Sequence, residues 1–271
     1  MRIGNKSFID KRTYIMGILN VTPDSFSDGG IHNSIDRALI RVEKMLEEGA
    51  DVIDIGGEST RPGYKQITDK EEIDRVIPIV REIKKHFDVL VSVDTYKSQV
   101  AKAALEAGSD MINDIWGLKY DSKMAQLIKE YNASCCIMHN RDNASYASFL
   151  DDVISDLKQS LSIAYSVGIE KDRVLIDPGV GFAKSYEQNL EIINKVDKLH
   201  VLDVPILLGT SRKSVIGCAL DLPTYERLEG TLATTVVAVM KGCRFVRVHD
   251  IKENKRVIKM TERILYGTNQ D

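Results

Sequence analysis

The sequence predicts a single (β/α)8 barrel, and three observations support this fold class. Short β-type runs alternate with amphipathic stretches of helical length eight times along the chain. The β-type runs are nearly continuous in apolar residues, as is typical of parallel strands whose two faces are both buried. The length of 271 residues also suits this TIM barrel, which usually needs about 250 residues.

The predicted strands and helices follow one another without an intervening linker. The strands are predicted at residues 14–19, 52–56, 89–94, 111–115, 134–139, 174–178, 205–209 and 244–249. The helices are predicted at residues 34–48, 69–86, 97–107, 122–131, 149–167, 186–199, 225–241 and 252–266, the seventh after a short turn. An open doubly wound sheet is the alternative, but no Gly-x-Gly-x-x-Gly motif follows the first strand. Residues 1–271 are therefore predicted to form one domain with its core at about 13–267.

Residues at the ends of the helical stretches support these boundaries. Thr68 with Glu71, and Ser185 with Gln188, have the spacing of a capping box, in which each member satisfies a free N–H group of the other. Four predicted helices are followed by the residue that most readily adopts the left-handed conformation of a helix end: Gly49, Gly108, Gly168 and Gly242.

The composition excludes several classes of protein. A net charge of −3 argues against a general nucleic-acid-binding protein, which is expected to be strongly basic. The amino-terminal residues lack the apolar segment of a signal peptide, and no apolar run approaches the roughly 20 residues that cross a bilayer. The four cysteines form no CxxC pair, so we expect reduced thiols, a cytoplasmic location and no zinc site.

Polar or charged residues stand at the carboxyl end of nearly every predicted strand. In this fold, functional groups collect where the strands end and the following loops begin. The residues at these positions are Asn20, 60–63, 94–95, 113–114, 139–140, 177–179, 211–213, Arg247 and His249. A barrel kept only for stability has no reason to gather such residues on one rim, so we predict the active site there.

The rim residues fall into two chemical groups. Asp94, Asn113 and Asp177 suit a flat heterocycle with a guanidine-like edge, because a carboxylate accepts two parallel N–H bonds. The second group is cationic and comprises Arg61, Arg212, Lys213, Arg247 and His249. Loops after the seventh and eighth strands are the usual phosphate site of this fold. The predicted ligand therefore has a hydrogen-bonding ring at one end and a phosphate group at the other.

The loop after the first strand combines ligand-type side chains with one aromatic residue. Residues 18–30 read ILNVTPDSFSDGG, in which Phe26 stands among hydroxyl, amide and carboxyl groups. An isolated Phe in a loop is usually an anchor. We interpret Phe26 as a ligand contact instead, because Thr60, Arg61 and Pro62 are expected at the same rim.

The order and length of these motifs resemble one known family. The motifs are ILNVTPDSFSDGG, IDIGGESTRPG, VSVDT, MINDI, IDPGVGF, GTSRKS and VRVHD, from Met16 to about Ile251. They are similar to the motifs of dihydropteroate synthase. That family joins p-aminobenzoate to 6-hydroxymethyl-7,8-dihydropterin diphosphate and releases pyrophosphate with the help of Mg²⁺.

The resemblance implies a role for each matching residue. The implied catalytic residues are Asp94, Asp177 and Lys213. The implied pterin pocket comprises Asp94, Asn113, Met138, Asp177, Phe182 and Lys213. The implied diphosphate site comprises Asn20, Arg61, Arg247 and His249, with Asn20 also a ligand of Mg²⁺. The residues implied around p-aminobenzoate are Phe26, Thr60, Pro62, Ser211 and Arg212.

Three points of the sequence stay open. After the fifth strand the chain reads MHNRDNASY where the family commonly has MHMQG, so the resemblance assigns no role to His139 or to residues 139–148. Asp54 and Glu58 suit either the site or a structural bond to a neighbouring loop. Trp116, the only tryptophan, is interpreted as a packing residue.

Other functions were weighed against the synthase. A pterin-binding methyltransferase that works with a corrinoid protein would keep Asp94, Asn113 and Asp177, but it needs neither a diphosphate site nor the Ser-Arg-Lys loop. A non-catalytic scaffold would not need the polar rim. An aldolase that forms a Schiff base on Lys213 would be excluded if borohydride failed to trap substrate. Residues 226–242 carry apolar residues around more than one face, and with the family resemblance they predict a homodimer.

Overall fold

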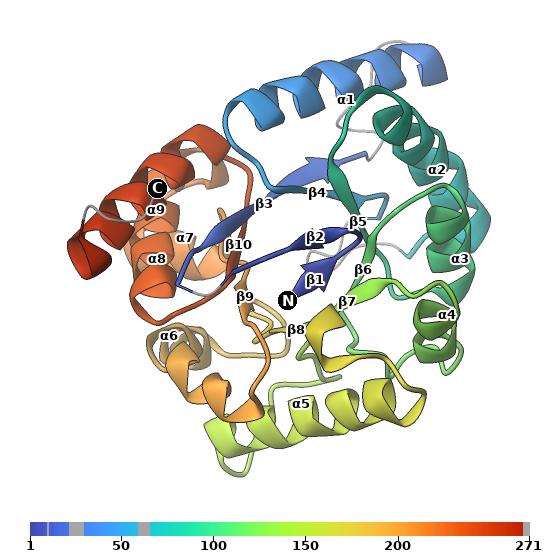
Figure 1. Ribbon diagram of the computed structural model, residues 1–271. Helices are drawn as coiled ribbons and strands as arrows, with labels where there is room; N and C mark the ends of the chain where they lie inside the picture. Colours follow the sequence, from blue (N-terminus) through green and yellow to red (C-terminus); the bar gives the residue numbers. More distant parts are fainter. Residues whose placement is uncertain (10, 22–29, 59–65, 268–271) are drawn as a thin grey trace.

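The computed structural model describes residues 1–9, 11–21, 30–58 and 66–267, and it contains the predicted barrel (Figure 1). Eight parallel strands lie in the order β8-β7-β6-β5-β4-β3-β10-β9. An isolated parallel bridge between Ile176 and Ile206 brings the two ends of this order together. The strands are β3 Tyr14–Asn20, β4 Val52–Gly56, β5 Leu90–Asp94, β6 Met111–Asp114, β7 Ser134–Met138, β8 Val174–Asp177, β9 Leu207–Leu208 and β10 Phe245–Val248.

Helices surround the barrel on its outer side (Figure 1). The α-helices are α1 Gly30–Glu47, α2 Asp69–His86, α3 Ser98–Glu106, α4 Met124–Glu130, α5 Phe149–Ser166, α6 Tyr186–Asn194, α7 Ser214–Leu220, α8 Leu228–Met240 and α9 Ile251–Tyr266. Short 3₁₀ helices cover Lys171–Arg173, Val196–Leu202 and Thr224–Glu226. The helices bury their apolar faces against the outer faces of the strands, so both faces of each strand are covered.

Several predicted boundaries differ from the structure. The helix predicted at 186–199 is α6 followed by a separate 3₁₀ helix that begins after Lys195. The short turn predicted after the seventh strand contains α7, and that strand is paired over only two residues, Leu207–Leu208. The helix predicted from residue 122 begins at Met124, because Asp121 accepts bonds from the backbone N–H groups of Ser98 and Lys123 and holds a turn there.

The predicted helix caps are confirmed. Thr68 and Glu71 form a complete capping box at the start of α2, and Ser185 and Gln188 form another at the start of α6. The four glycines after helix ends, Gly49, Gly108, Gly168 and Gly242, have φ of +100°, +102°, +87° and +75°. These local signals therefore placed the starts of α2 and α6 and the ends of α1, α3, α5 and α8 to within one residue.

An apolar layer fills the amino-terminal half of the barrel. Every strand contributes to this inner apolar layer, β3 with Tyr14 and Met16 and the others with one buried side chain each: Val52, Leu90, Met111, Cys136, Leu175, Leu207 and Phe245. An antiparallel hairpin of β1 (Arg2–Ile3) and β2 (Lys6–Ser7) closes that end, and its Ile3 and the following Phe8 pack on the same layer. Figure 1 shows the hairpin lying across the end of the barrel. The sequence did not predict this hairpin.

No helix in the described part of the chain is both long enough and apolar enough to cross a membrane. Among the described cysteines, Cys135, Cys136 and Cys243 are buried free thiols, and Cys218 is an exposed one. Burial raises the pKa of Cys135 to about 12, so this thiol stays protonated and packs as a small apolar side chain.

Candidate active site

A polar layer lies inside the barrel directly beyond the inner apolar layer. Residues two apart in a strand point to the same face. Five polar side chains lie two residues beyond a member of the apolar layer: Asp54, Ser92, Asn113, Asp177 and Arg247. Asp94 lies four residues beyond the β5 member of that layer. The strand pattern therefore brings three carboxylates, an amide and a guanidinium together near the carboxyl end of the barrel.

Arg247 lies between two of these carboxylates. Its Nε donates to Asp54 Oδ2 at 2.6 Å, and its Nη2 donates to Asp94 Oδ2 at 2.6 Å. The two carboxylate side chains are 0% and 7% exposed, whereas the Arg247 side chain is 19% exposed. One cation thus offsets two buried negative charges, and it remains accessible from the rim.

Asp54 is a structural member of the site in this structure. Its Oδ2 accepts from Arg247 and also from Asn113 Nδ2 at 3.4 Å. Asp54 therefore holds two side chains that the sequence placed in different subsites. The Oδ1 atoms of Asp54 and Asp94 are buried without a partner among the described residues. Since buried polar atoms are nearly always hydrogen-bonded, Asp94 Oδ1 is a candidate acceptor for a ligand N–H group.

Burial changes the protonation of the pocket. It raises the pKa of Asp94 to about 7, against the opposing charge of Arg247. Burial also raises the pKa of Asp177, against the charge of Lys213, and it lowers the pKa of Lys213 to about 8. Asp94 and Lys213 can therefore change their proton occupancy near neutral pH when a charged ligand arrives.

Lys213 reaches the pocket from the loop after β9. Its Nζ donates to the carbonyl of Val180 at 2.5 Å and lies 5.1 Å from the centre of the Phe182 ring. A Cβ atom placed on Gly209 would lie 3.3 Å from Asp177 Oδ2 and 3.9 Å from Lys213 Nζ. The carboxylate and the ammonium group therefore converge on Gly209, where the missing side chain leaves room.

Apolar side chains form one wall beside these polar groups. Met138 is buried in a cluster with Tyr96 and Ile115, and Trp116 and Phe182 pack against that cluster. Trp116 is thus a packing residue, as the sequence interpretation had it. All six residues of the predicted pterin pocket lie at this end of the barrel: Asp94 is the register partner of Asn113, Met138 is that of Asp177, and Lys213 contacts Phe182.

The predicted residues of the seventh and eighth strands form a second group. Ser211 Oγ lies 2.9 Å from His249 Nδ1 and accepts the backbone N–H of His249 at 3.2 Å. Arg212 binds the carboxylate of Asp250 through Nε at 3.0 Å and Nη2 at 2.5 Å. The structure therefore brings Ser211 and His249 together, while Arg212 is already paired.

The remaining predicted residues end or follow β3 and β4 in the sequence, and of these the structure describes only Asn20. Asn20 ends β3 with an exposed side chain, which suits a ligand that approaches from the rim. Four predicted residues lie outside the described residues: Phe26, Thr60, Arg61 and Pro62. Their predicted roles stay predictions.

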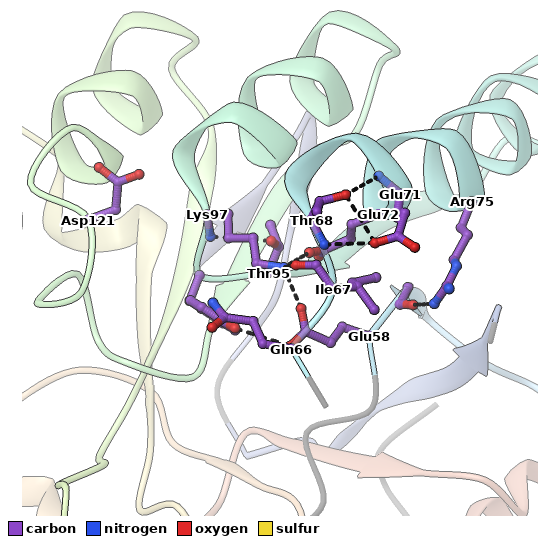
Figure 2. Close-up of polar contacts among 12 residues, drawn as sticks. Glu58, Gln66, Ile67, Thr68, Glu71, Glu72, Arg75, Thr95, Lys97 and Asp121 are labelled. Atoms are coloured by element: carbon purple, nitrogen blue, oxygen red, sulfur yellow. Dashed lines mark hydrogen bonds and ion pairs between the residues drawn. The ribbon is translucent and has the colours of Figure 1, made fainter. Parts of the chain in front are cut away.

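Glu58 belongs to a buried ion cluster between α2 and α3 (Figure 2). The Lys97 ammonium binds Glu58 Oε2, Glu72 Oε2 at 2.8 Å and the carbonyl of Ile67 at 2.8 Å. Glu58 also accepts from the Tyr96 hydroxyl at 3.1 Å. Glu58, which follows β4, is therefore linked through Lys97 to Glu72 on α2. Of the two roles that the sequence left open for Glu58, the structure shows the structural one.

His139 is also bound within the protein. Its side chain is 0% exposed, with Nε2 3.0 Å from Asp156 Oδ2 and Nδ1 2.8 Å from Lys184 Nζ. Sequence reasoning did not single out Lys184 or Asp156. No sequence signal connects them to His139, because they are 45 and 17 residues away along the chain.

The chain matches the family model described as "Pterin binding enzyme" over residues 16–249. The chain therefore belongs to the family of pterin-binding enzymes. A dihydropteroate synthase of Clostridium beijerinckii is 56% identical over 98% of this chain and 99% of its own length. That of Bacillus subtilis is 50% identical over 94% and 90%. Within its family, the chain thus groups with the dihydropteroate synthases.

Solved structures show the same likeness. A Clostridium difficile dihydropteroate synthase, crystallised in the presence of pteroic acid, has a TM-score of 0.93 and 48% identity, covering 97% of this chain and all of its own. A Yersinia pestis enzyme with a sulfonamide drug has a TM-score of 0.91 and 37% identity, covering 99% of both chains. A Xanthomonas albilineans enzyme with 4-aminobenzoic acid has a TM-score of 0.90 and 36% identity, covering 94% of both chains.

The ion cluster around Lys97 predicts a stability effect. Lys97→Met leaves the buried carboxylates of Glu58 and Glu72 without their cation, and breaking such a pair costs about 3–5 kcal/mol. Urea unfolding should therefore show a large loss of stability. Lys102→Met on the same helix is the control, because Lys102 and Glu106 are both more than half exposed and such pairs contribute little. Equal effects of the two substitutions would contradict the description of the cluster.

Proposed function

We propose that the polar rim of this barrel carries out the dihydropteroate synthase reaction. The substrates are 6-hydroxymethyl-7,8-dihydropterin diphosphate and p-aminobenzoate, and the products are 7,8-dihydropteroate and pyrophosphate. The observation that supports this most strongly is the convergence of Asp94, Asn113, Asp177 and Lys213 at one end of the barrel, in a chain that belongs to this family.

The pterin ring would lie against Met138 and Phe182, with its polar edge on the carboxylates. Asp177 Oδ1 already accepts the backbone N–H of Gly179 at 2.7 Å, so Oδ2 faces the space beside Gly209. Asp177 and Asn113 would bind the aminopyrimidinone edge, because a carboxylate and an amide can together accept and donate there. Lys213, as a point-charge donor, would bind the ring carbonyl and N5.

The reaction is a substitution at the exocyclic CH₂ of the pterin. The C–O bond to the diphosphate breaks with its electron pair on the leaving oxygen, the amine of p-aminobenzoate forms the new C–N bond, and the amine releases a proton. Because the dihydropterin ring is electron-rich, it can share the positive charge that develops on the CH₂. We therefore expect a dissociative path in which Asp94 and Asp177 stabilise the cationic ring while Arg247 and His249 bind the leaving group.

No covalent enzyme intermediate is needed on this path, so Lys213 has no role as a nucleophile. A methyltransferase that works with a corrinoid protein would use the same ring pocket. It would have no use for a diphosphate site such as the pair of Ser211 and His249 could serve, nor for the Ser-Arg-Lys loop, and the synthase is therefore the better interpretation.

Formation of the product tests the proposal directly. Purified protein is incubated with the two substrates and Mg²⁺, and dihydropteroate is measured by chromatography. We expect product that depends on both substrates and on protein. Absence of product, together with methyl transfer from a methylated pterin to a corrinoid protein, would favour the alternative.

Asp177→Asn is predicted to weaken pterin binding at least tenfold. The substitution keeps the shape of the side chain but can turn an acceptor into a donor that faces a ligand N–H. An unpaired buried polar group costs about 1–3 kcal/mol, and 1.4 kcal/mol is a factor of ten in affinity. Calorimetry with 6-hydroxymethyl-7,8-dihydropterin measures the effect. Unchanged affinity would remove Asp177 from the proposed pocket.

The residues of the rim fit a magnesium ion that arrives with the diphosphate. In the described part of the chain, no group of three or more His, Cys, Asp or Glu side chains could hold a metal ion. Mg²⁺ is often bound by one or two protein oxygens, with substrate phosphates and water completing its coordination. The exposed amide of Asn20 can supply such an oxygen. The ion would then offset the charge of the leaving diphosphate.

Binding of pyrophosphate tests this metal site without an activity assay. In calorimetry, we expect pyrophosphate to bind more tightly with Mg²⁺ than without it, and Asn20→Ala to reduce this difference. A difference that persists unchanged in Asn20→Ala would show that Asn20 is not a ligand.

The surface of α8 supports the predicted homodimer. The inner face of this helix is partly polar, because Thr231 and Thr235 are buried and Thr235 Oγ1 donates to Asn254 Oδ1 at 2.7 Å. Apolar side chains are correspondingly left towards the outside, and Met240 is 62% exposed. On the two helices that contact α8, Leu220 of α7 and Ile264 of α9 are also exposed, at 48% and 71%. Exposed apolar side chains on adjoining helices are typical of a protein–protein interface.

Analytical ultracentrifugation at micromolar concentration is expected to show a species of about twice 30.4 kDa. Met240→Glu should shift the protein towards the monomer, because it places a charge in the proposed interface. Ile40→Glu is the matched control, since Ile40 is an equally exposed apolar residue on α1 (66%). A monomer in the unmodified protein would contradict the dimer. The cytoplasmic location stays a prediction.

A further inference from the structure

The loop between β8 and α6, residues 178–185, carries Phe182 and the Val180 carbonyl that binds Lys213. Phe182 is in the wall of the proposed pterin pocket. The backbone of this loop cannot rely on regular secondary structure, because Gly179, Gly181 and Ala183 have φ of +70°, +86° and +42°. Side chains from other elements must therefore hold it in place.

Lys184 supplies most of this support. Its Nζ donates to the carbonyl of Gly179 at 3.0 Å, to the carbonyl of Phe182 at 3.1 Å, and to His139 Nδ1 at 2.8 Å. Burial lowers the pKa of Lys184 to about 7, against the charge of Asp177. In its protonated form the ammonium group has three hydrogens, and these three acceptors use all of them. Two of the three bonds fix the loop on either side of Val180, and the third ties it to the end of β7.

His139 connects Lys184 to Asp156 on α5. Burial, followed by the charge of Lys184, lowers the pKa of His139 to about 3, so the imidazole is neutral. A neutral imidazole has one donor and one acceptor nitrogen. Since Lys184 donates to Nδ1, the proton lies on Nε2 and is donated to Asp156 Oδ2. Asp156 also accepts from Arg141 Nε at 2.6 Å.

The segment after β7 contacts the same loop from a second side. The hydroxyl of Tyr146 donates to the carbonyl of Ala183 at 2.8 Å, and Arg141 stacks 4.4 Å from the Tyr146 ring centre. A Cβ atom on Gly179 would lie 2.0 Å from the carbonyl oxygen of His139, so the two backbones are in direct contact. The MHNRDNASY segment, to which the family resemblance gave no role, therefore packs against the loop that carries Phe182 and holds it in place.

We propose that Lys184, held by His139 and Asp156, is a positioning residue that sets the place of Phe182 and the Val180 carbonyl in the pterin pocket. This inference rests on the proposed function. Lys184 acts through the loop backbone and touches no reacting atom. Its loss should weaken binding of the pterin and leave the residues at the p-aminobenzoate and diphosphate sites in place.

Lys184→Met is the first test, because it keeps the length of the side chain and removes all three hydrogen bonds. We expect the affinity for 6-hydroxymethyl-7,8-dihydropterin, measured by calorimetry, to fall at least tenfold, and the KM for p-aminobenzoate at saturating pterin diphosphate to change by less than about twofold. Lys195→Met is the control, because Lys195 forms only a surface pair with Glu191.

Trp116 provides a readout in the absence of ligand. It is the only tryptophan, and it packs against the same cluster as Phe182. A displaced Phe182 should therefore shift the fluorescence emission of Lys184→Met, while Lys195→Met keeps the emission of the unmodified protein. Unchanged emission together with unchanged pterin affinity would overturn the inference. An equal loss of affinity for both substrates would also overturn it, because it would indicate general disruption.

Three further variants keep the test decisive if Lys184→Met does not fold. Asp156→Asn retains an oxygen that accepts from His139, so it should keep pterin affinity close to that of the unmodified protein, whereas Asp156→Leu should lose it. Tyr146→Phe removes only the bond to the Ala183 carbonyl and should cause a smaller loss. If all three bind the pterin equally, the inference fails. Failure of the unmodified protein to bind the pterin would instead contradict the proposed function.

Discussion

The alternation of side chains in eight closed strands is the constraint on which the site depends. Every strand must direct one set of side chains into a narrow interior, and the inner apolar layer fills the amino-terminal half of that space. The next inward positions then bring Asp54, Asn113, Asp177 and Arg247 to the rim side of that layer. A register shift of one residue in any strand would turn its polar side chain towards a helix. The apolar layer therefore fixes the polar layer above it.

The polar layer has an excess of negative charge. Among its neighbours, Arg247 and Lys213 face the carboxylates of Asp54, Asp94 and Asp177. Burial raises the pKa of Asp94 to about 7 against the charge of Arg247, and the negative charge of Asp54 adds to this rise. A ring that donates N–H groups, and later becomes cationic, would offset the excess negative charge of the polar layer. The pocket is thus arranged for a ligand of that charge, and it does not need to reorganise its dipoles during the reaction.

Much of the fold could be predicted from the sequence because its signals are local and repeated. Apolar runs, capping boxes such as Thr68 with Glu71, and glycines after helix ends each act within a few residues. The hairpin of Arg2–Ile3 and Lys6–Ser7 was missed because strands of two residues are too short to show a pattern.

The candidate site was predicted only in part, for a related reason. The rim residues could be found because strand ends meet in a barrel, whatever their partners are. The partners themselves could not, because Arg247 binds acids that are 193 and 153 residues away along the chain. The same holds for Lys97, which binds Glu58 after β4 and Glu72 on α2. Which charged residues form ion pairs depends on distances in the folded chain, and the spacing of residues in the sequence does not give these distances.

The hairpin at the amino terminus also determines which end of the molecule can be modified. It covers the barrel where the strands begin: Ser134 Oγ donates to the Arg2 carbonyl, and Phe8 stacks 5.0 Å from the Phe245 ring. The polar rim opens at the opposite end. A label or a surface linkage attached to Met1 would therefore stand a full strand length away from the rim. Immobilised in this way, the molecule would present its rim to the solution, which suits sensor formats that detect small ligands.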